Sequence, residues 1–266
     1  TSSVANPPAV TPAQTTTYIV TYTDPSNPCP GSDSVTVTVN PIPTVSITPA
    51  TQTICSGSAI TPLVITNPNN VAGTTFNWSR TNTTNITGIA ASGTSATITG
   101  TLVNTTNTQQ STVITVTGAA NGCSSATTTA TITVNPRPFI QPQTRTTCSN
   151  TPFTAVAPTN GGGNIVPAGT TYSWPAPVVT GGMTGGSAGS GQNSISQTFI
   201  NNTGAPQTAT YTITPTSGTP GNCVGPAFTL VVTVNPLPVP SITANYCADP
   251  NSGYVQLTAY PSPPGY

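Results

Sequence analysis

The sequence predicts an all-β chain built from tandem seven-stranded β-sandwiches that are joined by short Pro-rich linkers. Three observations predict this fold. Val, Ile, Thr and Tyr alternate with other residues over many short runs, which is typical of half-buried strands. A Val-Asn-Pro-x-Pro motif recurs at residues 39–43, 134–138 and 234–238. No stretch places apolar residues at helical spacing, and the Thr, Gly and Pro content disfavours helices.

The composition indicates a folded chain despite its bias. Ser and Thr make up 82 of the 266 residues, and there are 30 Pro and 24 Gly, which is a pattern common in disordered segments. Hydrophobic residues nevertheless make up 34% of the chain, and the mean hydropathy is −0.01. This apolar content is sufficient for pleated, half-buried strands.

The near absence of charge excludes most chemistry. The charged residues are three Arg and three Asp, with no Lys, Glu or His. A Ser-His-Asp or Cys-His nucleophile is therefore impossible, and Asp24, Asp33 and Asp249 are too scattered for paired acid–base work. Three Arg cannot neutralise a nucleic-acid backbone. We expect no enzyme activity, no cofactor, no metal site and no nucleic-acid partner.

Membrane insertion is not expected either. No apolar run approaches the roughly 18 residues that span a bilayer. Residues 1–20 lack the basic start and apolar stretch of a signal peptide, so any targeting segment would lie outside this sequence.

The repeated motif marks domain boundaries. Each copy ends an alternating strand, at 35–39, 128–134 and 228–234, and its Asn residues lie 95 and 100 residues apart. Two Pro that flank one residue cannot continue a strand ladder and favour an extended connection. The period is too long for a solenoid and suits a sandwich domain.

The boundaries divide the chain into two complete repeats, 41–135 and 136–235, between two truncated ones, 1–40 and 236–266. For the first complete repeat we predict strands near 44–48, 60–66, 74–80, 84–89, 95–101, 111–118 and 126–135. For the second we predict strands near 138–143, 152–157, 169–175, 177–180, 193–199, 207–215 and 227–235.

The truncated repeats would leave unpaired strand edges if each stood alone. Residues 1–40 hold only closing strands, at 17–22 and 34–39, and the C-terminal part holds only opening ones, including 254–258. One interpretation is a window of a longer tandem array. The other is strand exchange, in which the C-terminal part of one molecule completes the N-terminal part of the next. The two parts together are shorter than one repeat, which weighs against exchange.

Six cysteines keep a fixed place in the repeat and are disulfide candidates: Cys29, Cys55, Cys123, Cys148, Cys223 and Cys247. Because no CxxC pair or His accompanies them, an oxidising, extracellular setting is the better inference than a zinc site. Two connectivities stay open. One is Cys55–Cys223 between domains, which the opposite ends of a sandwich slightly favour. The other is Cys55–Cys123 with Cys148–Cys223 inside domains.

The strings Ile-Cys-Ser-Gly at 54–57, Asn-Gly-Cys at 121–123 and the closing Val-Thr-Val-Asn-Pro-x-Pro carry a resemblance. They resemble the PKD-like or immunoglobulin-like (Ig-like) tandem repeats of very large secreted surface proteins of Bacteroidota. The resemblance covers the whole chain. It implies export by type IX secretion and a role in cell-surface adhesins, gliding-motility adhesins or extracellular filaments.

Aromatic residues form two candidate groups. Trp78 and Trp174 lie in matching predicted strands and are interpreted as core residues between the sheets, with sugar stacking as the alternative. Four tyrosines crowd the C-terminal part and would form a binding patch unless a completed domain buries them: Tyr246, Tyr254, Tyr260 and Tyr266.

Modification and loop signals are weak. The five Asn-x-Ser/Thr sequons are no more than chance supplies in a chain so rich in Ser and Thr: Asn77, Asn82, Asn85, Asn104 and Asn201. Asp33-Ser34-Val35 resembles the O-glycosylation motif of Bacteroidota, which makes Ser34 a candidate acceptor. The glycine-rich stretches 160–164 and 181–191 lack the helix and Lys of a phosphate cradle, so we expect mobile loops.

These observations predict a non-catalytic stalk or filament segment of an extracellular cell-surface adhesin. The alternative is a carbohydrate-binding or surface-binding module of a secreted protein, which would need exposed aromatic residues. A neutral surface lacks the repulsion that keeps proteins apart. The expected partners are therefore other copies, neighbouring repeats of the same chain, or a surface glycan.

Overall fold

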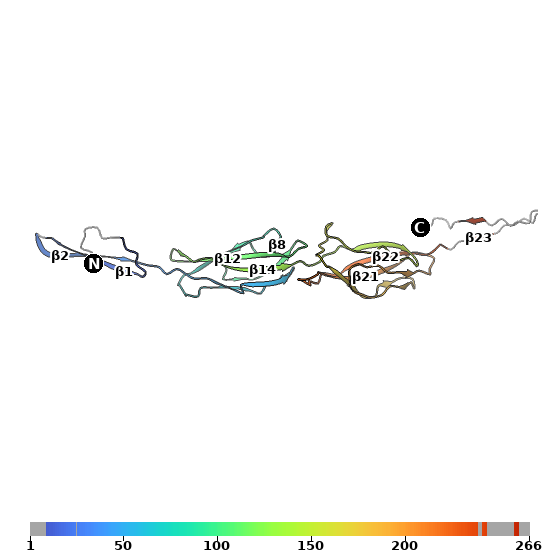
Figure 1. The fold of residues 1–266 in the computed structure, drawn as a ribbon, viewed down its shortest axis with the longest axis horizontal. Helices are drawn as coiled ribbons and strands as arrows, with labels where there is room; N and C mark the ends of the chain where they lie inside the picture. Colours follow the sequence, from blue (N-terminus) through green and yellow to red (C-terminus); the bar gives the residue numbers. More distant parts are fainter. Residues whose placement is uncertain (1–8, 25, 239–240, 244–257, 261–266) are drawn as a thin grey trace, which may run out of the picture. The chain divides into compact units, whose positions relative to one another are not determined.

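The computed structural model describes residues 9–24, 26–238, 241–243 and 258–260, and Figure 1 shows the course of the chain. Every regular element in this part is a strand, which confirms the predicted all-β class. Within the same residues there is no helix with the length and apolar character to cross a membrane. The chain forms two compact units, residues 1–105 with 109–134 and residues 106–108 with 135–266.

The first unit contains a sandwich made of short strands. They are β3 (Ser46–Thr48), β4 (Thr51–Cys55), β5 (Ser58–Ala59), β6 (Leu63–Thr66), β7 (Thr75–Arg80), β8 (Ile86–Thr87), β9 (Ser92–Gly93), β10 (Thr97–Ile98), β11 (Thr101–Asn104), β12 (Gln110–Ala120), β13 (Cys123–Ser124) and β14 (Thr128–Asn135).

One layer of this sandwich is the sheet β4-β14-β12-β7-β9, with β13 paired to β12. The strand sets β10-β6-β3 and β5-β11-β8 supply further strands around the core. Along β12 every second residue from Thr112 onward is buried, as the period of two requires when one face of a sheet meets the core. The core is mainly aliphatic and includes Leu63, Ile114 and Ile132, each 0% exposed.

The second unit repeats this plan. Its strands are β15 (Gln143–Cys148), β16 (Thr171–Trp174), β17 (Val178–Val179), β18 (Thr184–Gly185), β19 (Gly189–Gln192), β20 (Phe199–Ile200), β21 (Gln207–Thr216) and β22 (Phe228–Asn235). The sheet order β15-β22-β21-β16-β19 matches β4-β14-β12-β7-β9 strand for strand. β15 runs parallel to β22, whereas β21 pairs with β22 and β16 antiparallel.

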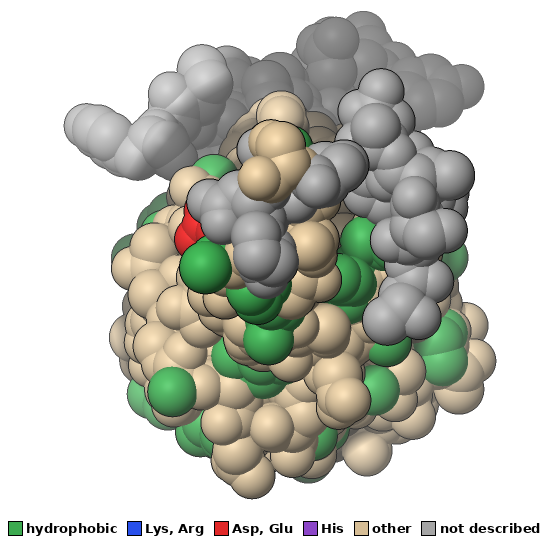
Figure 2. Space-filling model, turned by 90° about the vertical axis from the view of Figure 1, so that its left-hand side faces the viewer, with side chains coloured by type: hydrophobic (Ala, Val, Ile, Leu, Met, Phe, Trp, Pro, Cys, Tyr) green, Lys and Arg blue, Asp and Glu red, His purple; other side chains and the backbone are tan. Residues whose placement is uncertain are grey.

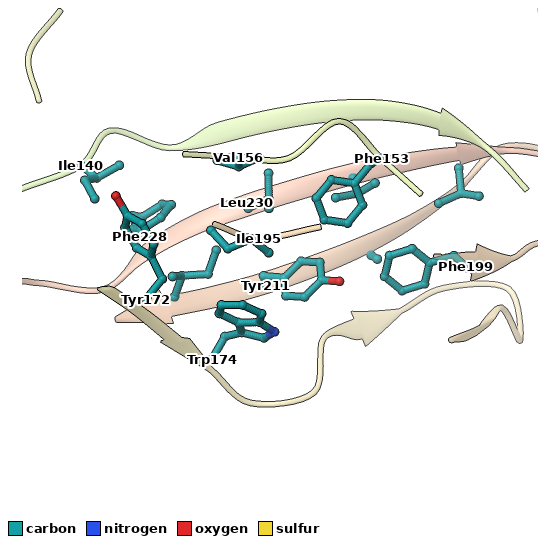
Figure 3. Close-up of a cluster of buried hydrophobic side chains, with 14 of the residues drawn as sticks. Ile140, Phe153, Val156, Tyr172, Trp174, Ile195, Phe199, Tyr211, Phe228 and Leu230 are labelled. Atoms are coloured by element: carbon teal, nitrogen blue, oxygen red, sulfur yellow. The ribbon is translucent and has the colours of Figure 1, made fainter. Parts of the chain in front are cut away.

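The core of the second unit is aromatic where that of the first is aliphatic. Figure 3 shows Tyr211 among the rings of Phe153, Trp174 and Phe199, with centroid distances of 6.1 to 6.3 Å. All three contacts are edge-on, which is the favoured geometry for aromatic pairs. Tyr211 occupies the register position of Ile114, because each pairs with the residue four places before the Val of its boundary motif.

Each unit contains a cross-strand pair of Trp and Gly. Trp78 in β7 lies opposite Gly93 in β9, and Trp174 in β16 lies opposite Gly189 in β19. A Cβ atom on Gly93 would lie 2.5 Å from Trp78 Cζ2, and one on Gly189 would lie 2.4 Å from Trp174 Cζ2. Glycine is required there because the indole covers its neighbour's backbone. The spacing from Trp to Gly is the same in both units.

Several predicted elements differ from the structure. The region 181–191 is not a loop throughout, because β18 and the start of β19 lie within it and Gly189 supports the Trp174 ring. The predicted strand near 152–157 is reduced to a single bridge between Val156 and Ile195. The edge strand β4 was not predicted, because Thr51–Cys55 is polar and alternates without a fully buried side.

Two hairpins lie outside the sandwiches. Near the N-terminus, β1 (Thr16–Asp24) pairs antiparallel with β2 (Asn27–Val37). Near the C-terminus, β23 (Ser241–Thr243) pairs with β24 (Thr258–Tyr260). The second hairpin has the register of β3 and β6, since Ser46 opposes Thr66 as Ser241 opposes Tyr260.

The Trp and Gly contact leads to a stability prediction. Gly189→Ala places a methyl group inside the buried Trp174 ring, so we expect the free energy of unfolding of the second unit to fall by about 1–3 kcal/mol. Guanidinium denaturation followed by tryptophan fluorescence measures it. Gly204→Ala is the matched control, because its Cβ meets nothing within 4 Å, and it should change stability by less than about 0.5 kcal/mol. Equal stability of the two variants would contradict the packing argument.

Candidate functional site

The polar residues that the two units share lie in the interior. Among the residues that the structure describes, no group of three or more His, Cys, Asp or Glu side chains could hold a metal ion. Buried Ser and Asn side chains instead occupy equivalent places in both units: Ser56, Asn104, Ser149 and Asn201, all with at most 7% exposure. These four residues form what we call the Ser–Asn clamps.

In the first unit, the clamp joins the turn after β4 to the end of β14. The Asn104 backbone N–H donates to Ser56 Oγ at 3.0 Å, and Ser56 Oγ donates back to the Asn104 carbonyl at 3.3 Å. Asn104 Nδ2 donates to the carbonyl of Val134 at 3.0 Å. One amide side chain therefore satisfies a carbonyl near the end of the closing strand β14.

The second unit repeats two of these contacts. The Asn201 backbone N–H donates to Ser149 Oγ at 2.9 Å, and Asn201 Nδ2 donates to the carbonyls of Val234 at 2.8 Å and Ala205 at 2.9 Å. Asn201 Oδ1 accepts from the N–H and hydroxyl of Thr203. Every polar atom of the Asn201 side chain is thus used inside the fold.

The clamp serine lies in a tight turn in both units. The residue after it has a left-handed backbone, with φ of 83° at Gly57 and 63° at Asn150. Gly and Asn are the residues that adopt this conformation at least cost. The N–H groups of these two residues donate to the carbonyls of Leu102 and Phe199. The sequence Cys-Ser-Gly/Asn is therefore a turn that anchors the start of the sandwich to its later strands.

The second unit adds a polar network around its aromatic core. The Tyr211 hydroxyl donates to Gln197 Oε1 at 2.7 Å, and Gln197 Nε2 donates to the Ser187 carbonyl at 2.9 Å. Trp174 Nε1 donates to the same carbonyl at 3.0 Å. Burial raises the pKa of the Tyr211 phenol far above its usual value, and it also raises the pKa of Tyr172. The Tyr211 phenol therefore acts as a structural hydrogen-bond donor.

The one buried cation in the described residues holds a loop. Arg80, which is 9% exposed, donates through Nε and Nη2 to the carbonyl of Ile89 and through Nη1 to that of Ile86. Burial lowers the pKa of Arg80 below its usual value. The guanidinium fork fits such a cluster of carbonyls, so Arg80 closes the segment between β7 and β9.

The structure places both tryptophans in the core. Trp78 is 8% exposed and Trp174 is 6% exposed, and neither indole ring is available for sugar stacking. Trp78 Nε1 is buried and has no hydrogen-bond partner within the described part of the chain, whereas its counterpart in the second unit has one. The predicted tyrosine patch lies outside the residues whose side chains the structure describes.

The cysteines are in two states. Cys55 and Cys223 are each disulfide-bonded, whereas Cys123 and Cys148 carry free thiols. The connectivity Cys55–Cys123 with Cys148–Cys223 is therefore wrong, because it needs both of the free residues. The pairing Cys55–Cys223 stays a prediction, and Cys247 lies outside the described residues.

The predicted glycosylation sites differ in how deeply they are buried. Asn104 and Asn201 are clamp residues, so two of the five sequons are buried polar groups of the fold. Asn82 has a left-handed backbone, and its Nδ2 donates to Gln110 Oε1. Ser34 is exposed in β2, and its backbone N–H donates to Asp33 Oδ1 at 2.8 Å. O-glycosylation of Ser34 stays a prediction.

The repeated Asn was a signal that sequence reasoning missed. In both units it begins an Asn-x-Thr or Asn-Thr-Thr string, 30 and 33 residues before the Val of the boundary motif, and it follows a Cys-Ser pair by a similar interval. Alignment of the two repeats on that Val, with a gap of three residues, would have brought Asn104 and Asn201 together. Treating them as sequons hid their structural role.

The clamp leads to a prediction with a neighbouring control. Asn201→Ala leaves the buried carbonyl of Val234 without its donor, so we expect the free energy of unfolding to fall by about 1–3 kcal/mol. Asn202→Ala changes an exposed residue of the same type at the next position, and it should alter stability by less than about 0.5 kcal/mol. Chemical denaturation of both variants measures the difference. A clamp variant as stable as its control would refute the role of Asn201.

The cysteine states lead to a second prediction. Alkylation of the native, oxidised protein should label Cys123 and Cys148 but not Cys55 or Cys223. Digestion under non-reducing conditions should then release one linked pair of peptides that holds Cys55 and Cys223. A peptide linked through Cys123 or Cys148, or a link from Cys223 to Cys247, would contradict the predicted pairing.

The comparison with protein families agrees with the repeated architecture. The model of the PKD-like domain family matches residues 47–138 and 145–238, one match for each unit. No curated protein matches the chain.

Among solved structures, the protocadherin gamma B2 extracellular cadherin domains 3–6 align with a TM-score of 0.37 and 12% identity, covering 94% of this chain and 68% of that one. Human CDH23 domains EC21–23 align with a TM-score of 0.35 and 15% identity, covering 84% of this chain and 81% of that one. Because the family model covers both sandwiches, which make up most of the sequence, the chain belongs to the PKD-like domain family.

Proposed function

We propose that this chain is a non-catalytic structural segment, part of the stalk or filament of an extracellular cell-surface adhesin. The observation that carries the proposal is the use of the recurring polar residues. In both units the buried Ser and Asn donate to or accept from the backbone, and both Trp rings support a facing Gly. These residues maintain a shape and are not presented to a substrate.

The family and the cysteine chemistry support an extracellular setting. PKD-like domains are typically non-catalytic, and tandem copies are consistent with a surface or adhesion module. Disulfides persist in oxidising compartments and are rare in the cytosol. The bonded Cys55 and Cys223 therefore indicate a secreted or extracellular protein.

The finer setting follows from the sequence resemblance. Repeats of this kind resemble those of large secreted Bacteroidota surface proteins, and we include gliding-motility or related adhesins and type IX secretion in the proposal. The binding alternative is weaker, because the tryptophans that would stack on a sugar are buried. Under the binding alternative, a glycan would have to contact surface residues other than the tryptophans.

The uncharged surface supports association with like surfaces. Figure 2 shows a face made mainly of uncharged polar and hydrophobic groups, in keeping with the 2% of charged residues in the chain. Such a surface lacks both the charge repulsion that keeps proteins apart and the ion pairs that salt would screen. Neighbouring repeats or other copies are therefore the proposed partners.

A mechanical experiment tests the structural role. The 266-residue chain is held by handles at its two ends and stretched in a single-molecule force instrument. A load-bearing segment should show discrete unfolding events, because strand pairs in a sandwich must break together. Extension without discrete events, as in an unstructured chain, would reject the stalk proposal.

A variant without the disulfide separates the mechanical effect of the disulfide from that of the folded strands. If Cys55 and Cys223 pair, the chain between them stays locked in the oxidised protein, and the gain in contour length is correspondingly small. The double variant Cys55→Ser, Cys223→Ser should release two events of similar length, one from each unit. A glycan array with the wild-type chain completes the test, since strong, specific sugar binding would favour the binding alternative.

A further inference from the structure

The hairpin of β1 and β2 has the register of the closing strands of a complete unit. Measured from the Val of the boundary motif, Val37 matches Ile132 and Val232, and Val35 matches Ala130 and Leu230. Their cross-strand partners match as well, because Tyr18 opposes Val35 as Ile114 opposes Ala130 and Tyr211 opposes Leu230. The hairpin is therefore a third copy of the strand pairs β12–β14 and β21–β22.

The face that is core in the complete units is uncovered on the hairpin. Val20, Tyr22 and Val35 are 61% to 66% exposed, and Val37 is 37% exposed. The residues at the matching positions of Val20 and Val37 in both complete units are 0% exposed, and those matching Val35 are at most 1% exposed. Asp33 occupies the position of the partly exposed Thr128 in the first unit and of Phe228, which is 4% exposed, in the second.

A two-stranded hairpin with such a face is at most marginally stable in water by itself. In the complete units the same face is covered by strands that precede the closing pair in the chain, such as β6 with Leu63 and the segment that carries Phe153. The missing cover therefore has a defined chemistry, namely the opening strands of a PKD-like repeat.

One residue of the hairpin, Tyr18, distinguishes between the two kinds of core. At the position where the first unit has Ile114, the hairpin has Tyr18, as the second unit has Tyr211. In the second unit that phenol needs room among Phe153, Trp174 and Phe199, and it needs the acceptor Gln197 Oε1. The aliphatic core around Ile114 lacks such space, since interiors are close-packed.

We propose that the apolar face of the β1–β2 hairpin is covered by opening strands of the aromatic-core type, joined on the N-terminal side of β1. The covering segment resembles residues 139–206 of this chain and supplies a hydrogen-bond acceptor to the Tyr18 hydroxyl. This inference rests on register and burial and does not depend on the proposed stalk function.

Two chimeras of the full chain test the proposal. In the first, residues 139–206 replace residues 1–13, so that the aromatic-type opening strands precede Gln14 as they precede Gln207. In the second, residues 44–109 of the aliphatic unit take that place, as they precede Gln110. Hydrogen exchange of the amides in β1 and β2 is measured by mass spectrometry, with the amides of β12 and β21 as internal references for intact folding.

The aromatic chimera should slow exchange in the hairpin by about 100-fold or more relative to the 266-residue chain, as expected when an open segment joins a cooperative core. The aliphatic chimera should protect it less. With Tyr18→Ile, the aliphatic chimera should protect the hairpin more than the aromatic chimera does. The smaller Ile leaves a cavity in the aromatic chimera and relieves overpacking in the aliphatic one. This reversal is a result that a general stabilising effect of any added segment would not give.

Three outcomes would overturn the proposal. The first is protection in neither chimera while the reference amides stay protected. The second is equal protection by both segments with no response to Tyr18→Ile. The third is hairpin protection in the unmodified chain that rises with protein concentration, because the cover would then be a second copy of this chain.

Discussion

The pairing of two long closing strands is the constraint on which the rest of the structure depends. In both units this pair, β12–β14 and β21–β22, lies at the centre of the main sheet, and one face of it supplies residues that are 0% or 1% exposed. The strand that bears the tryptophan pairs with one side of it, and the opening edge strand lies beside the other. The Ser–Asn clamp then binds a carbonyl near the end of the closing strand, that of Val134 or Val234. A shift of one residue in this register would turn every core side chain to solvent.

The scarcity of charge changes how the interior satisfies its polar groups. An ordinary domain can use ion pairs, but here the three Arg donate to backbone carbonyls: the buried Arg80 to a loop and, nearer the surface, Arg137 to Val224 and Arg145 to Thr144. Elsewhere Thr, Ser and Asn side chains form hydrogen bonds with the backbone, because a short hydroxyl or amide can reach a neighbouring backbone group. The fold therefore depends mainly on hydrogen bonds to neutral backbone groups, which salt screens far less than ion pairs.

The sequence was sufficient for the fold class, because alternation over β12 and β22 and the repeated Val-Asn-Pro-x-Pro motif are strong local signals. It was not sufficient for the short strands of the facing layer. Elements such as β8 and β10 have two residues each and are defined by their partners, so local propensity carries little information about them. The buried role of Asn104 and Asn201 was hidden for a related reason. Burial of a polar residue is decided by the carbonyl it meets, and that carbonyl lies 30 or more residues away.

The two cores show how one backbone plan accepts different interiors. Ile114 and Leu102 in the first unit correspond to Tyr211 and Phe199 in the second, where the two rings are in contact, so the larger residues occur together. A single exchange would overpack one core or leave a cavity in the other, whereas a concerted set preserves close packing. Two features stay constant between the units, the Trp and Gly pair and the Ser–Asn clamp, and both help to fix the strand register. In the second unit Trp174 packs edge-on against Tyr211. The Trp and Gly pair and the core therefore meet at the residue that takes the place of Ile114, and we expect that residue to influence which opening strands a closing pair can accept.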